Sequence, residues 1–136
     1  LNNCEVISDN KIKSHVLKKS VFAITKSGTV SLEICNAKIP SIIIYKMGLI
    51  NFLLIKILVK TKYANILNIA AKEEIIPELI QSNCTPKKIF EHVSDFLDNP
   101  QKMKTQVERT QKILDNFKTS KSSSDKAAIS LNKILN

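Results

Sequence analysis

Side chains that could bind a polar ligand gather in one short stretch, Ile24 to Glu33, where a polar turn follows an apolar run. The turn holds Ser27, Gly28 and Thr29, and Glu33 follows Thr29 by four residues, which places both on one face of a helix. A carboxylate one turn inside a helix N-terminus can accept two hydrogen bonds from a sugar diol. The spacing is compatible with a sugar-binding site. The spacing alone favours the plain alternative, a capped helix in which Glu33 only complements the helix dipole.

The elements around this stretch predict how it is held. Val21–Ile24 and Ser41–Tyr45 are apolar, β-prone runs, as buried parallel strands are. Lys11–Lys19 and Thr29–Ala37 have helical spacing, and Cys4–Ile7 is a short apolar segment before them. The resulting order, β-α-β-α-β, is typical of an α/β fold with a Rossmann-like parallel sheet and flanking helices. In such sheets ligands bind at the carboxyl ends of the strands.

The second half of the chain predicts mostly helices. Thr85 and Pro86 are a helix cap and a first helical residue, and Gln101–Phe117 continues as a long polar helix. The remaining segments are an extended segment and loop at Tyr63–Ala70, a short acidic helix at Glu73–Gln81, a linker at Ser120–Ser124 and a small amphipathic helix at Asp125–Leu135.

Composition limits the classes of function. Hydrophobic residues make up 43% of the 136 residues, enough for the core of one domain. The net charge of +9 would suit a nucleic acid or an anionic membrane. Arg109 is the single arginine and only 5% of residues are aromatic, so we expect no nucleic-acid partner. Cys4, Cys35 and Cys84 form no CxxC pair, and we expect neither a metal site nor a disulfide framework.

The most hydrophobic segment is Met47–Val59. Gly48, Asn51 and Lys56 interrupt it, so we do not expect a membrane-spanning helix, which needs about 20 mostly apolar residues. Two interpretations stay open. The segment is a core helix with a basic exit, or its lysines bring it to an anionic membrane surface.

The order of the segments resembles the C-terminal part of the lipid-A-disaccharide synthase family, the GT-B glycosyltransferases of family 19. The resemblance covers about Glu5 to Leu135. Leu67 stands where the family usually has proline, and Lys72 and Glu73 stand where a Gly-Arg pair is usual. The matching blocks are Ser-Gly-Thr-Val-Ser-Leu-Glu at 27–33, Ala-Lys-Ile-Pro at 37–40, Tyr-Lys-Met at 45–47, Leu-Val-Lys-Thr-Lys-Tyr at 58–63, Asn68, and Glu-Ile-Ile-Pro-Glu-Leu-Ile-Gln at 74–81.

This resemblance implies the C-terminal, donor-binding half of a GT-B fold with a helical C-terminal tail. Residues 1–118 would be a partial nucleotide-sugar domain, and residues 119–136 a linker and a C-terminal helix. The implied enzyme transfers 2,3-diacylglucosamine from UDP-2,3-diacylglucosamine to 2,3-diacylglucosamine 1-phosphate with inversion, and it needs no metal or other cofactor. It works at the cytoplasmic face of the inner membrane as a peripheral protein, and a homodimer of the full-length enzyme is also implied.

The resemblance also assigns residues to the donor site. Asn68 would lie in a loop near the donor and Glu74 would order that loop, although both could simply cap the loop. The family's catalytic base belongs to an N-terminal domain, so we expect no catalytic residue in this chain. The other donor-binding residues are Glu33, which would accept hydrogen bonds from the ribose hydroxyls, and Ser27, Gly28 and Thr29, which would border the diphosphate or the ribose.

Two other functions stay open on the residues alone. The chain could be a nucleotide-binding or partner-docking module that makes no sugar bond, or a basic module that binds a membrane surface. Because the chain starts at Leu1 and is less than half as long as the family's enzyme, we expect a fragment. Its few parallel strands would leave an edge uncovered, so we expect little catalysis by the chain alone.

Overall fold

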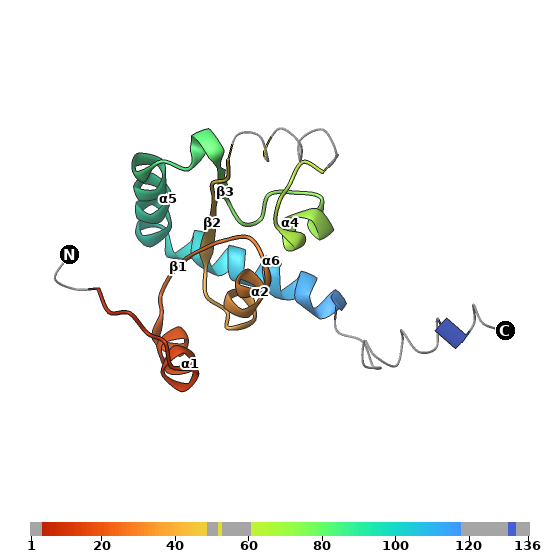
Figure 1. The fold of residues 1–136 in the computed structure, drawn as a ribbon, viewed down its shortest axis with the longest axis horizontal. Helices are drawn as coiled ribbons and strands as arrows, with labels where there is room; N and C mark the ends of the chain where they lie inside the picture. Colours follow the sequence, from red (N-terminus) through yellow and green to blue (C-terminus); the bar gives the residue numbers. More distant parts are fainter. Residues whose placement is uncertain (1–3, 49–51, 53–60, 118–130, 133–136) are drawn as a thin grey trace.

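The computed structural model describes residues 4–48, 52, 61–117 and 131–132. In this part of the chain three parallel strands form one sheet in the order β1-β2-β3, and helices flank it (Figure 1). The elements are α1 (Asn10–Lys19), β1 (Ala23–Thr25), α2 (Thr29–Asn36), β2 (Ser41–Tyr45), α4 (Ile66–Ala71), β3 (Glu78–Ile80), the 3₁₀ turn η1 (Gln81–Asn83), α5 (Pro86–Asp98) and α6 (Pro100–Phe117).

The central strand β2 is apolar because both faces of the sheet are covered. Ile43 packs on one side with residues of α2, α4 and α6, while Ile42 packs on the other side with Leu79 and with Phe96 of α5. The Phe96 ring lies 5.3 Å from that of Phe22, which precedes β1. Burial on both faces explains why β2 has no polar alternation. This parallel sheet with flanking helices confirms the α/β class with a Rossmann-like sheet that the sequence predicts.

Helix α6 joins the two sides of the sheet. Its first half contributes Met103 to the α5 side, and its second half contributes Ile113 and Leu114 to the α2 and α4 side. Between them, the buried Gln106 side chain accepts a hydrogen bond from Ser41 N at 2.7 Å. Its amide nitrogen donates to the carbonyl oxygens of Ser41 and Ile75. Figure 1 shows α6 passing the end of the sheet where β2 begins, so this helix fixes the amino ends of the strands.

Local capping explains the helices that the sequence predicts correctly. Asp9 accepts hydrogen bonds from the backbone of Lys11 and Ile12 and starts α1. Thr85 caps α5, with Pro86 as its first residue. The predicted helices at 11–19, 29–37 and 101–117 are confirmed to within one residue at each end.

Three sequence predictions were wrong. Cys4–Ile7 is not a strand, and the third strand is instead β3, inside the segment expected to be an acidic helix, Glu73–Gln81. This strand has only three residues and is stabilised by pairing with β2, which no local pattern reveals. Tyr63–Ala70 was expected to be extended, yet α4 begins at Ile66 because the Asn65 side chain caps it by accepting a hydrogen bond from Leu67 N.

Some expectations fall outside the described residues. They are the greater part of the hydrophobic segment Met47–Val59, the Ser120–Ser124 linker, and the C-terminal helix Asp125–Leu135 apart from Leu131 and Asn132, which are helical.

We predict that Gln106→Leu lowers the free energy of unfolding by about 2–3 kcal/mol, because it leaves the backbone groups of Ser41 and Ile75 unpaired. Urea unfolding measures the change. Gln101→Leu is the matched control, since Gln101 is exposed on the same helix. Equal midpoints for the two variants would contradict the role given to Gln106.

The end of α4 carries a strained residue. Lys72 has φ 58° and ψ 22°, the left-handed conformation that favours glycine, and its N–H caps the helix. Lys72 is also a position where the resembling family usually has glycine. The side chain at this position therefore costs stability.

Lys72→Gly should raise the free energy of unfolding by about 1 kcal/mol, because it removes the Cβ from the left-handed conformation. Thermal unfolding measures the gain. Lys72→Ala keeps the Cβ and should give no gain, so the same gain from alanine would show that backbone strain is not the cause.

Candidate functional site

A hollow of about 920 Å³ lies at the carboxyl ends of the three strands. Residues that follow each strand line it, together with the segment that leads into α4. This is the edge at which open parallel sheets bind their ligands. The described lining residues are Lys26 and Ser27 after β1, Tyr45 and Met47 at the end of β2, Ile80, Gln81, Ser82 and Asn83 at the end of β3, and Phe52, Thr61, Lys62, Tyr63, Ala64 and Ile69.

Side-chain hydrogen bonds to the backbone hold this edge together. The Gln81 side chain accepts from Met47 N at 2.8 Å and donates to Met47 O at 3.1 Å, which ties the exits of β2 and β3. Ser27 Oγ donates to Ala64 O at 2.9 Å, which ties the exit of β1 to the segment before α4. The rim of the hollow is therefore fixed by polar contacts between segments distant in the sequence.

Behind the rim lies a polar network centred on the Glu78 carboxylate. It accepts hydrogen bonds from Ala64 N at 2.8 Å, Asn65 N at 2.9 Å and Asn68 Nδ2 at 2.8 Å. Asn65 is fully buried, and its amide donates to Ser31 Oγ of α2 at 2.9 Å. Neither Glu78 nor Asn65 was predicted as a site residue. No sequence signal marked Glu78, because the strand that carries it was expected to be part of an acidic helix.

The predicted turn forms the start of α2. Gly28 is the N-cap residue, with φ 145° and ψ −163°, a conformation that only glycine adopts readily. Its carbonyl accepts hydrogen bonds from the N–H and the hydroxyl of Ser31. Ser27 lines the hollow, whereas Gly28 and the exposed Thr29 lie beside it without lining it.

Glu33 lies outside the hollow. Its side chain is 53% exposed and forms an ion pair with Lys13 of α1, with Nζ 2.8 Å from Oε2. This contact joins α1 to α2. Any hydrogen bond that Glu33 accepts from a sugar hydroxyl would have to coexist with this pair or replace it.

Asn68 and Glu74 make the contacts of loop-capping residues. Asn68 is fully buried; its oxygen accepts from the N–H groups of Ile75 and Ile76, and its amide donates to Ile76 O and to Glu78. Glu74 accepts a hydrogen bond from Glu78 N at 3.1 Å. Neither residue lines the hollow.

Glu73, which stands where the resemblance implies an arginine, also lies away from the hollow. Its carboxylate forms an ion pair with Arg109 of α6. This contact joins the loop after α4 to the long helix. Glu73 therefore has a structural partner, and neither residue of the pair lines the hollow.

Of the described lining residues, only Ser27 was predicted from the sequence as a site residue. Two lysines that were not predicted each lie over a tyrosine ring: the Lys26 ammonium lies 4.9 Å from the centre of the Tyr45 ring, and the Lys62 ammonium lies 5.4 Å from that of Tyr63. The place of Lys26 shortly after the apolar run Val21–Ile24 was a signal for that residue, whereas the start of α4 after Lys62 and Tyr63 was not predicted.

Two side chains away from the hollow have shifted pKa values. Burial raises the pKa of the Cys35 thiol to about 11, against a weaker opposing effect of a hydrogen bond with Ser41, so the thiol stays protonated near neutral pH. A hydrogen bond with Lys102 lowers the pKa of Asp95 on α5. Neither shift falls on a residue of the hollow.

The described residues contain no cluster of three or more histidine, cysteine or acidic side chains that could hold a metal ion. Among the same residues, no helix is both long enough and apolar enough to cross a membrane.

We predict that Asn68→Ala lowers the free energy of unfolding by about 2–4 kcal/mol, because four hydrogen bonds in a buried network are lost. Thermal or urea unfolding measures it. Asn36→Ala, at an exposed position of α2, is the control and should change stability little. A stable Asn68→Ala protein would show that the network is dispensable for folding.

Comparison with known proteins gives one consistent match. The family model of lipid-A-disaccharide synthetase matches residues 2–131. The lipid-A-disaccharide synthase of Rickettsia prowazekii is 40% identical over 108 residues, which are 79% of this chain and 28% of that relative. That of Rickettsia bellii is 38% identical over 109 residues, 80% of this chain and 28% of the relative. That of Rickettsia conorii is 46% identical over 92 residues, 68% of this chain and 21% of the relative. The chain therefore spans less than a third of the length of these curated relatives.

Proposed function

Because this chain belongs to the lipid-A-disaccharide synthetase family, we propose that it is the donor-binding part of a glycosyltransferase. The match over residues 2–131 is the observation that carries this proposal. The hollow at the carboxyl ends of the strands supports it, since it lies where a nucleotide binds in a parallel sheet.

The proposed reaction joins two acylated sugars. UDP-2,3-diacylglucosamine donates its sugar to 2,3-diacylglucosamine 1-phosphate with inversion, and UDP leaves. Backbone N–H groups and fixed positive charge can stabilise the departing diphosphate without a metal ion. The chain contributes this stabilisation and no catalytic base, so we propose that it forms little disaccharide alone.

We propose Ser27, Gly28 and Thr29 as the residues that border the diphosphate or the ribose. The place of Ser27 in the lining and the start of α2 at Thr29 support this. Glu33 is proposed to bind the ribose hydroxyls, either beside its ion pair with Lys13 or in place of it. Asn68 and Glu74 are proposed to act indirectly, by holding the segment that carries the rim.

The acyl chains of the substrates place the reaction at a membrane. We propose that the full-length enzyme binds the cytoplasmic surface of the inner membrane peripherally and forms a homodimer. The net charge of +9 supports contact with anionic lipid.

Titration calorimetry with UDP tests the donor site. The chain should bind UDP, and Glu33→Ala should weaken binding by about 1–3 kcal/mol if its carboxylate binds the ribose. Lys13→Ala is the matched control, because it breaks the same ion pair and leaves the carboxylate in place.

The two variants separate a ligand role from a structural one. Equal losses in both would mean that Glu33 matters only through its ion pair with Lys13. Unchanged affinity in Glu33→Ala would remove it from the site, and no UDP binding by the unmodified chain would contradict the proposed function.

A further inference from the structure

The hollow carries positive charge. Its described lining includes two lysines, Lys26 and Lys62, and no acidic residue. Nearby carboxylates such as Glu78 and Glu33 are engaged by other groups and do not line it. Charge of one sign in a concave surface attracts a ligand of the opposite sign, so the occupant should be an anion.

The two lysines belong to segments that are held against each other. Lys26 directly precedes Ser27, and Lys62 lies two residues before Ala64. The hydrogen bond from Ser27 Oγ to Ala64 O, 2.9 Å long, joins these segments at the rim. Because both lysines line the same hollow, one anionic ligand that occupies it can contact both ammonium groups.

Both ammonium groups make contacts with the protein that a ligand can replace. Each lies over a tyrosine ring of the lining, Lys26 over Tyr45 and Lys62 over Tyr63. Within the described residues neither lysine has an ion-pair partner, in contrast to Lys13, Lys87 and Lys104. A cation–π contact at an exposed site is weaker than a charge-assisted hydrogen bond to phosphate, so a phosphate group can draw the ammonium from the ring.

We propose that Lys26 and Lys62 together bind the diphosphate of the donor nucleotide. That the ligand is a nucleotide rests on the proposed function. That its diphosphate lies at this place rests on the two lysines. The lysines act as binding residues that recognise the charge, and the other lining residues face the remaining parts of the ligand.

The test compares three probes on the purified chain: UDP, uridine and inorganic pyrophosphate. Lys26→Gln and Lys62→Gln should each weaken UDP and pyrophosphate binding by about tenfold and leave uridine binding unchanged. Raising the ionic strength should weaken UDP binding to the unmodified chain more than to either variant.

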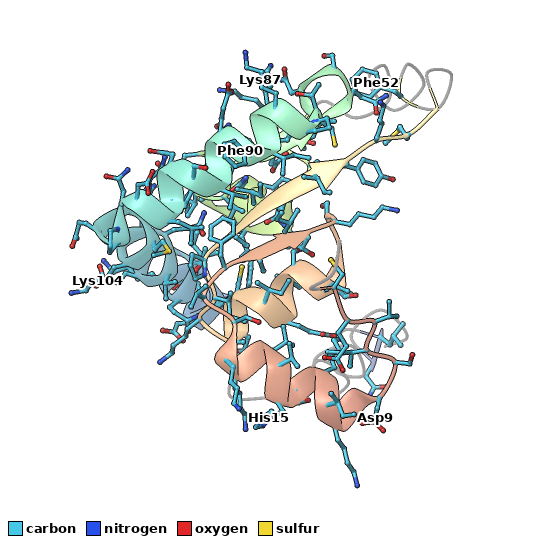
Figure 2. All side chains as sticks on the ribbon, turned by 90° about the vertical axis from the view of Figure 1, so that its left-hand side faces the viewer. Asp9, His15, Phe52, Lys87, Phe90 and Lys104 are labelled. Carbon is cyan, nitrogen blue, oxygen red and sulfur yellow. The ribbon has the colours of Figure 1, made fainter. Side chains whose placement is uncertain are left out.

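Lys104→Gln is the matched control because it removes the same charge from another place. Figure 2 shows Lys104 at the opposite side of the molecule from Phe52, which lines the hollow. Lys26→Arg and Lys62→Arg keep the charge and should bind UDP nearly as well as the unmodified chain. Circular dichroism shows whether each variant is folded.

The outcomes separate this proposal from the proposed function. Variants that bind UDP as tightly as the unmodified chain, or equal weakening by Lys104→Gln, would overturn the lysine pair and leave the donor site standing. Lysine-dependent binding of pyrophosphate, with no advantage for UDP, would support the pair and contradict the uridine nucleotide. Binding of none of the three probes would overturn both.

Discussion

The described structure depends on buried side-chain amides and one carboxylate that pair with backbone groups at the ends of the strands and in the segments between them. A sheet of three parallel strands satisfies few backbone groups by itself, and the turns that lead into it are partly buried. Asn68, Glu78 and Gln106 supply the missing hydrogen bonds at both ends of the strands. Because a buried backbone group without a partner is costly, these side chains determine where the loops can run.

The same network prepares the candidate site. Glu78 lies in β3, yet it binds the N–H groups of Ala64 and Asn65, and so holds the segment that carries Lys62 and Tyr63. The segment before α4 thus takes part in the hydrogen-bond network that stabilises the fold, and it also carries Lys62, which lines the hollow. The contacts that stabilise the fold therefore also hold the segment from which Lys62 extends.

Much of the fold follows from local chemistry. Capping by Asp9 and Thr85 starts two helices where the sequence predicts them, and the apolar run of β2 is recognisable without any tertiary information. The strand β3 is different, because its three residues are stabilised by pairing with β2 and by burial of Leu79. Short elements of this kind take their conformation from their neighbours.

The sequence alone determined the α/β class, the turn at Ser27 and Gly28, and a resemblance that the family match confirmed. The tertiary structure decided which side chains surround the hollow, and it placed Lys26 and Lys62 in one lining while pairing Glu33 with Lys13. The physical reason is the separation along the chain over which each kind of interaction acts. Capping and hydrophobic periodicity act within a few residues, whereas the hollow joins strand ends that are separated by many residues along the chain.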